Sequence, residues 1–155
     1  AETGRYVQSS SHRVIRNLNW LIIAPNDSGG QSLIVIDKPD NWETPLGQIN
    51  IREEESGAES VTADSNTALL NLAEIQFPLI LSKWKQGDYF YPLGMSHKKK
   101  IARFLIDQKV SATEKENVWV LESNKKICWL VGLRIDDRFK LKSTTTKQLR
   151  IKLLQ

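Results

Sequence analysis

Short apolar runs separated by turn-forming residues occupy most of this 155-residue chain, and they restrict the folds that it can adopt. The clearest run lies near the end, where Leu149, Ile151 and Leu153 alternate with Arg150 and Lys152. Alternation with a period of two is typical of a strand that buries one face. Similar runs predict further strands at residues 12–16, 20–24, 33–37, 46–52, 67–73, 78–85, 117–122, 126–135 and 139–142. The pattern therefore predicts an α+β chain dominated by sheet.

Only one segment has the periodicity of a helix. Ile101, Phe104 and Leu105 follow the i, i+3, i+4 spacing of a single helix face. Ser96 stands just before this segment and is a suitable N-cap. The spacing predicts one main helix over residues 97–109.

The cysteine content and the apolar runs limit where such a protein can function. One cysteine, Cys128, excludes an intramolecular disulfide and a cysteine-based zinc site. It stands within the apolar run 127–131, which predicts a buried side chain. The longest purely apolar run, residues 20–24, is far shorter than the ~20 residues that span a bilayer, and no signal-peptide pattern opens the sequence. These features favour a cytoplasmic protein without a membrane partner.

The five tryptophans are candidates for stacking on sugars or bases. Trp20, Trp84, Trp119 and Trp129 lie in predicted strands beside aliphatic residues, so a core position is favoured for them. Trp42 is the only tryptophan on a predicted loop.

Charge is distributed unevenly along the chain. Residues 1–80 contain 5 Lys/Arg and 11 Asp/Glu, a net charge of −6, whereas residues 81–155 contain 17 and 7, a net charge of +10. A strongly basic half indicates a polyanionic partner such as nucleic acid, with solvated surface charge as the alternative. An anionic membrane is less favoured, because no amphipathic helix with exposed aromatic residues accompanies the charge.

No arrangement of residues indicates an active site or a metal site. His12 and His97 have no other ligand at metal-binding spacing. Asp136 and Asp137 are adjacent, so on a strand they would point to opposite faces, and a turn is the favoured interpretation. The glycine-containing segment 28–32 resembles the Ser-Gly-Gly-x-Asp-Ser loop of ATP pyrophosphatases but lacks its aspartate and the helix after it, which favours a hairpin turn.

The segment 84–100 contains the strongest candidate for phosphate binding. It combines glycines, a proline and three consecutive aromatic residues with the lysine run 98–100 at the start of the predicted helix. Cations at a helix N-terminus oppose the helix dipole. A bound phosphate would relieve this repulsion and accept hydrogen bonds from the first turn. Solvated lysines are the alternative.

Several blocks in this half resemble the C-terminal region of bacterial tRNA(Ile)-lysidine synthases. They are GDYFYPLGM at 87–95, KKK at 98–100, FLIDQKV at 104–110, VWVL at 118–121, WLVG at 129–132 and RIDDRFK at 134–140. Their order and spacing make the resemblance specific over residues 78–142. It is weaker over residues 1–77, and Ser111 stands where the family pattern leads us to expect proline.

The resemblance implies a mostly antiparallel, β-sandwich-like module with one main helix, which is also found in the β subunit of phenylalanyl-tRNA synthetase. It implies an ATP-dependent ligase that joins lysine to the wobble cytidine of a minor isoleucine tRNA. ATP and Mg would bind an N-terminal catalytic domain that these 155 residues do not include, so we expect no cofactor and no catalytic residue here. The expected partners are the acceptor stem of the tRNA and that catalytic domain, with a homodimer left open. A structural β domain that docks or self-associates without touching RNA is the alternative.

On this basis we expect basic side chains to contact phosphates and 2′-hydroxyls of an RNA stem. The primary candidates are Lys98, Lys99, Lys100 and Arg103, and the secondary candidates are Lys83, Lys85 and Lys109. Lys99 and Arg103 are expected to share one face of the predicted helix. The residues expected to shape the loop are Gly87, Asp88, Pro92 and Gly94.

The segment 53–65 is acidic, small and polar, which predicts a loop or a boundary between lobes. The expected division is a β-rich N-terminal part, residues 1–65, packed with a C-terminal tRNA-binding domain, residues 66–155.

Overall fold

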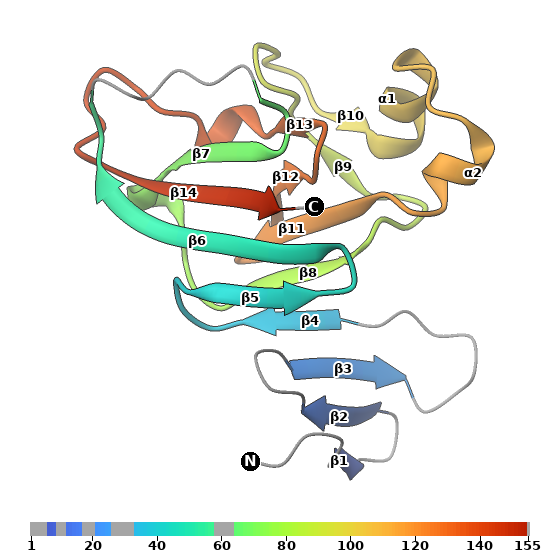
Figure 1. The fold of residues 1–155 in the computed structure, drawn as a ribbon. Coiled ribbons are helices and arrows are strands. Elements are labelled where there is room, and N and C mark those ends of the chain that lie inside the picture. Colours follow the sequence, from blue (N-terminus) through green and yellow to red (C-terminus); the bar gives the residue numbers. More distant parts are fainter. Residues whose placement is uncertain (1–5, 9–11, 17–20, 26–32, 58–63, 155) are drawn as a thin grey trace.

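Antiparallel strands are the dominant secondary structure of the described residues (Figure 1). The computed structural model describes residues 6–8, 12–16, 21–25, 33–57 and 64–154. The larger sheet has the order β1-β2-β3-β4-β8-β11-β12-β13. Its strands are β1 (Tyr6–Gln8), β2 (His12–Arg16), β3 (Leu21–Pro25), β4 (Leu33–Ile36), β8 (Leu79–Lys83), β11 (Trp119–Ser123), β12 (Lys126–Leu130) and β13 (Arg134–Ile135).

A second sheet has the order β5-β6-β14-β7, and a two-stranded ribbon joins β10 to β9. The strands of the second sheet are β5 (Asn41–Thr44), β6 (Gly47–Glu55), β14 (Lys147–Leu154) and β7 (Thr67–Asn71). The ribbon consists of β9 (Tyr89–Phe90) and β10 (Lys99–Lys100). The helices are α1 (Ile101–Asp107) and α2 (Ala112–Lys115), with the 3-10 turns η1 (Leu72–Glu74) and η2 (Asp137–Phe139). Within the described ranges, no helix is long and apolar enough to cross a membrane.

The two larger sheets bury one core between them. Ile34 of β4 and Leu81 of β8 pack in the same cluster as Leu149 and Ile151 of β14, and all four side chains are fully buried. Full burial of each such side chain stabilises the fold by about 1.5–3 kcal/mol. The alternation predicted for the last run is therefore confirmed, and the expected β-sandwich-like arrangement follows from the shared core.

A second core lies on the other face of β11 and β12. Phe90 of β9 and Phe104 of α1 meet edge to face with ring centroids 5.1 Å apart, and Val120 and Leu130 belong to the same cluster. Trp119 faces the sandwich core while its neighbour Val120 faces α1, as the alternation of a strand requires. This packing attaches the ribbon and α1 to the larger sheet.

The main helix is shorter than predicted and begins at Ile101, with Lys100 as its N-cap rather than Ser96. Lys99 and Lys100 form β10 by pairing with β9, and the Ile101 amide donates to the Asp88 carbonyl at 2.9 Å. These pairings hold the lysine run extended and exclude residues 97–100 from the helix.

A short helix that the periodicity missed follows α1. Ser111 caps α2 by accepting a hydrogen bond from the Glu114 amide at 3.2 Å. The Ser-x-x-Glu spacing is the sequence signal of such a cap.

Four predictions about strands and loops differ from the structure. Residues 139–142 form no strand, because Asp136 caps η2 and the chain turns there. Trp42 lies on β5 with 9% of its surface exposed, and its indole N–H donates to the Lys38 carbonyl at 3.0 Å. Residues 53–55 belong to β6 rather than to a loop. The predicted strand 126–135 is interrupted between β12 and β13 at Gly132, which has a φ of 78°.

Both sheets combine strands from either side of residue 65. β4 pairs with β8, and β6 pairs with β14 over eight residues. A division into lobes at residue 65 stays a prediction. The turns predicted at 17–19 and 28–32 and the acidic residues 58–63 lie outside the described residues.

Candidate nucleic-acid interface

The lysine run flanks an aromatic loop at the ribbon (Figure 1). Lys98 places its Nζ 4.9 Å from the centroid of the Tyr89 ring, which is 44% exposed. Lys100 is exposed beside α1. Leu93 and Met95 expose apolar surface on the same loop. A cation on an exposed aromatic ring is a common element of RNA-binding surfaces.

Lys99 and Arg103 are brought together through Asp107 rather than along one helix face. Lys99 lies on β10 and its Nζ is 2.5 Å from Asp107 Oδ2, while Arg103 Nε is 3.3 Å from Asp107 Oδ1. The hydrogen bond from Lys99 lowers the pKa of Asp107, with burial opposing it and the charge of Arg103 adding to it. The Lys99 charge is thus partly neutralised within the fold, whereas the Arg103 side chain stays 71% exposed.

The three secondary candidates are dispersed. Lys85 is exposed and its Nζ lies 3.5 Å from Asp88 Oδ1. Lys83 is half-buried at the end of β8, and Lys109 is exposed beyond the end of α1 with a φ of 58°. In the described part of the chain, no contact joins Lys83 or Lys109 to the lysine run.

The loop-shaping candidates lie at the turns of the 84–100 segment. Gly87 and Gly94 have φ values of 94° and 91°, which side chains other than glycine rarely adopt. Asp88 Oδ2 accepts a hydrogen bond from the Lys85 amide at 2.9 Å. Pro92 forms an isolated antiparallel β-bridge with Asp136.

Asp136 ties this loop to η2, a role that the sequence did not indicate. Its carboxylate is fully buried and accepts from the Tyr91 amide at 2.8 Å and from Arg138 Nε and Nη2, each at 3.0 Å. The Arg138 guanidinium also lies 4.4 Å from the Tyr91 ring centroid. Burial opposes ionisation of Arg138, but the bonds to Asp136 raise its pKa. The buried carboxylate therefore fixes both the loop and one arginine.

Asp137 makes a second connection to the loop. Its Oδ1 accepts from the Gly94 amide at 3.0 Å and lies 3.2 Å from Lys140 Nζ. The hydrogen bond from the Gly94 amide lowers the pKa of Asp137; burial opposes this, and Lys140 adds to the lowering. The two adjacent aspartates hold different partners, and the turn predicted for them is confirmed.

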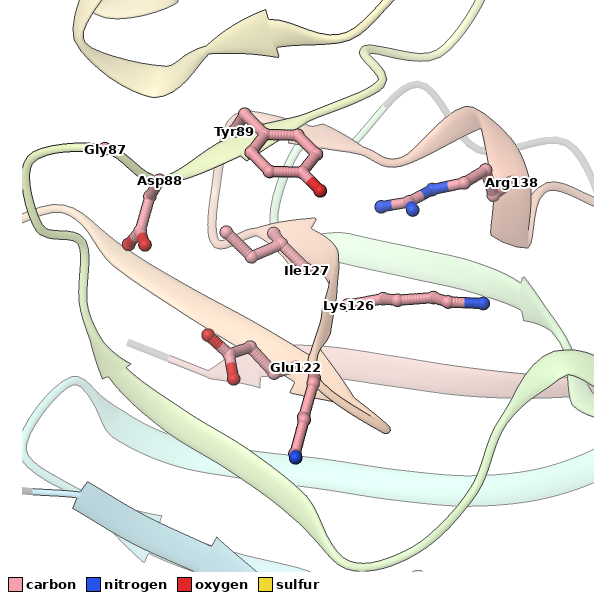
Figure 2. A pocket seen from close by; sticks show the side chains of 8 residues that line it. Gly87, Asp88, Tyr89, Glu122, Lys126, Ile127 and Arg138 are labelled. Atoms are coloured by element: carbon pink, nitrogen blue, oxygen red, sulfur yellow. The ribbon is translucent and has the colours of Figure 1, made fainter.

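A cleft of about 110 Å³ opens between the loop and the β11–β12 hairpin (Figure 2). Tyr89 and Arg138 lie on one side, and the carboxylates of Asp88 and Glu122 lie on the other. Burial raises the pKa of Glu122, with Lys85 opposing this rise and Asp88 adding to it. A cleft with both signs of charge and an aromatic ring suits a polar ligand.

No metal centre is evident among the described residues, since none of their His, Cys, Asp and Glu side chains form a group of three that could hold an ion.

Comparisons with known proteins agree with the resemblance seen in the sequence. A family model described as "TilS substrate C-terminal domain" matches residues 79–153. A tRNA(Ile)-lysidine synthase of Parabacteroides distasonis is 32% identical over 99% of this chain and 35% of that protein. One of Bacteroides thetaiotaomicron is 30% identical over 99% of this chain and 34% of that protein. The chain thus spans about a third of the length of these curated relatives.

A solved structure titled "Crystal structure of TILS C-terminal domain" matches with a TM-score of 0.64. The match covers 77% of this chain and 95% of that chain at 18% sequence identity. At this identity the likeness concerns the fold alone, and it confirms the predicted α+β class with mostly antiparallel sheet.

Proposed function

We propose that the chain is the tRNA-binding region of a tRNA(Ile)-lysidine synthase, because residues 79–153 match the family model described as "TilS substrate C-terminal domain". The observation that carries the proposal is the face formed by the 84–100 loop and α1. This face combines the exposed Tyr89 ring with the exposed cations Lys98, Lys100 and Arg103. The names of the curated relatives support the same assignment.

In this proposal the face binds the acceptor stem of an isoleucine tRNA. An A-form stem has a deep, narrow major groove that side chains do not enter, so the cations contact phosphates and 2′-hydroxyls. Lys98, Lys100 and Arg103 supply the charge. Asp107 and Lys99 position Arg103, and Asp136 holds the loop in place.

The parent enzyme in this proposal is an ATP-dependent ligase that attaches lysine to the wobble cytidine of that tRNA in the cytoplasm. ATP and Mg bind its N-terminal catalytic domain, against which this region docks. The region described here contributes binding and orientation of the tRNA and no step of the ligation.

Titration of a labelled isoleucine tRNA transcript with the 155-residue chain at several salt concentrations tests the proposal. We expect binding that weakens steeply with salt, because each phosphate contact contributes a slope of about −0.7 to −0.9 in log K against log salt. Self-association that is insensitive to salt, without tRNA binding, would contradict the proposal and favour an interaction domain.

A further inference from the structure

Glu122 is a half-buried carboxylate that accepts no hydrogen bond from any residue in the described part of the chain, although the charge of Lys85 acts on it. It lies on β11 and lines the cleft of Figure 2. Its side chain makes no hydrogen bond or ion pair with any residue in the described part of the chain. A carboxylate withdrawn from water is stabilised by hydrogen-bond donors. The neighbouring Asp88 cannot supply one, because its carboxylate already accepts from the Lys85 amide and carries the same charge. Lys85 acts on Glu122 only through its charge, and Lys125 and Lys126 line the cleft without a hydrogen bond to Glu122, so a ligand that enters the cleft can supply the donors.

Arg138 and Lys126 provide cations on the other side of the same cleft. The guanidinium of Arg138 is held by two hydrogen bonds to Asp136, and Figure 2 shows it directed toward the Tyr89 hydroxyl. Two of its nitrogens are occupied by Asp136, which leaves the third, Nη1, for a ligand. An arginine held in this way loses little conformational freedom when it binds a phosphate. Lys126 and Arg138 also line a second cleft.

Tyr89 supplies an aromatic ring at the entrance. Its ring is 44% exposed, and Ile127 forms part of the cleft beneath it. An exposed tyrosine is a platform on which an unpaired base can stack. One nucleotide provides all the groups that this cleft can bind: a donor edge for Glu122, a phosphate for Arg138 and a flat ring for Tyr89.

We propose that this cleft binds a single unpaired nucleotide of the bound RNA, with a guanine edge on Glu122 and a phosphate on Lys126 and Arg138. The inference rests on the proposed function and names a contact separate from the lysine run. Guanine carries an amino group and a ring N–H side by side, which match the two oxygens of a carboxylate. Uracil presents one N–H between two carbonyl oxygens, which repel a carboxylate. The cleft therefore discriminates guanine from uracil.

Titration of the isotope-labelled 155-residue chain with guanosine monophosphate, uridine monophosphate and inorganic phosphate, followed by amide NMR shifts, tests this inference. Guanosine monophosphate is expected to shift the amides of Gly87 and Ile127 and to bind about tenfold more tightly than the other two. The variant Glu122→Met removes the acceptor and should abolish the preference for guanine. Glu116→Met removes an exposed carboxylate outside the cleft and should leave the preference unchanged.

Two further measurements identify the phosphate contact and the source of the nucleotide. Lys126→Ala should weaken the binding of all three ligands alike. Glu122→Gln keeps the shape of the side chain, so a loss of preference that it shares with Glu122→Met does not come from misfolding. Isoleucine tRNA added to the guanosine monophosphate complex should reverse the shifts.

Equal affinity for the three ligands, or an unchanged preference in Glu122→Met, would overturn the inference. The inference would also fail if the tRNA binds the chain but does not displace the nucleotide. That outcome leaves the proposed function intact. If the tRNA does not bind at all, the proposed function itself fails.

Discussion

Asp136 holds the 84–100 loop in its conformation. Its buried carboxylate holds the Tyr91 amide and the Arg138 guanidinium, so Asp136→Ala leaves both donors without an acceptor. We expect the free energy of unfolding to fall by about 2–3 kcal/mol. Urea denaturation measures the change. Asp137→Ala, at a more exposed position, should cost less, and an unchanged midpoint for Asp136→Ala would refute the role given to this carboxylate.

Glu122 should make the stability of the domain depend on pH. Its pKa is raised by burial, with Lys85 opposing and Asp88 reinforcing this, so the folded state holds the proton more tightly than the unfolded state, whose value is near 4.5. Stability is then lost as the pH rises from below 4.5 through the folded pKa, and the loss persists at pH 7.

Replacement of that carboxylate should remove this loss. We expect Glu122→Gln to melt at a higher temperature than the wild type at pH 7, with the difference shrinking at pH 4. Thermal melts at the two pH values measure it. A variant that is less stable at pH 7, or a gain that grows at pH 4, would show that the buried charge carries no cost.

Residue burial was predictable where the neighbours along the chain decide it. The apolar run 127–131 correctly predicted that Cys128 is buried, and the structure leaves it fully inaccessible. Trp42 was misplaced because its burial depends on the pairing of β5 with β6, which the neighbours of Trp42 along the chain do not show. The pairing of Lys99 with Asp107 was invisible for the same reason, since it requires β10 to fold back beside α1.

Elements of four or more alternating residues were predictable, and the two-residue strands were not. β14 and β6 follow directly from period two. β9, β10 and β13 are too short to have a period, and they exist because Asp88, Asp136 and the second core fix their partners. The segment 139–142 alternates as a strand would, but the cap of η2 prevents pairing.

The N-terminus of α1 lacks a capping side chain. Lys100 occupies the N-cap in an extended conformation and makes no side-chain hydrogen bond to the helix. Because asparagine at an N-cap accepts from the first turn, we expect Lys100→Asn to stabilise the domain by about 0.5–1 kcal/mol. The same change should weaken tRNA binding through the lost charge. Urea denaturation and tRNA titration of one sample test both effects, and Lys98→Asn, outside the cap position, should weaken binding without the gain in stability.

At the scale of the whole molecule, part of the charge asymmetry of the sequence is neutralised by ion pairs between strands of the second sheet. Arg150 Nε of β14 lies 2.7 Å from Glu54 Oε1 of β6, and Gln148 donates to the same oxygen at 2.6 Å. Burial works against ionisation of Glu54, but these bonds together lower its pKa. The net charge of the two halves therefore overstates the basic surface, and only the placement of each side chain shows where exposed cations gather.

The claim that the loop and α1 form an RNA-binding face is tested most directly by a charge-matched comparison. Lys98→Ala, Lys100→Ala and Arg103→Ala together remove three exposed cations from this face, while Lys142→Ala, Lys147→Ala and Lys152→Ala remove three exposed cations from β14 and the segment before it. Lys99 is kept because it is bonded to Asp107.

The measurement is the slope of log K against log salt for isoleucine tRNA, with thermal melts of each variant. Three lost phosphate contacts should reduce the steepness of that slope by roughly two to three for the first triple variant and leave it nearly unchanged for the second. Both variants should melt close to the wild type. Equal slopes for the two variants, or a larger change for the second, would contradict the account and place the RNA elsewhere on the molecule.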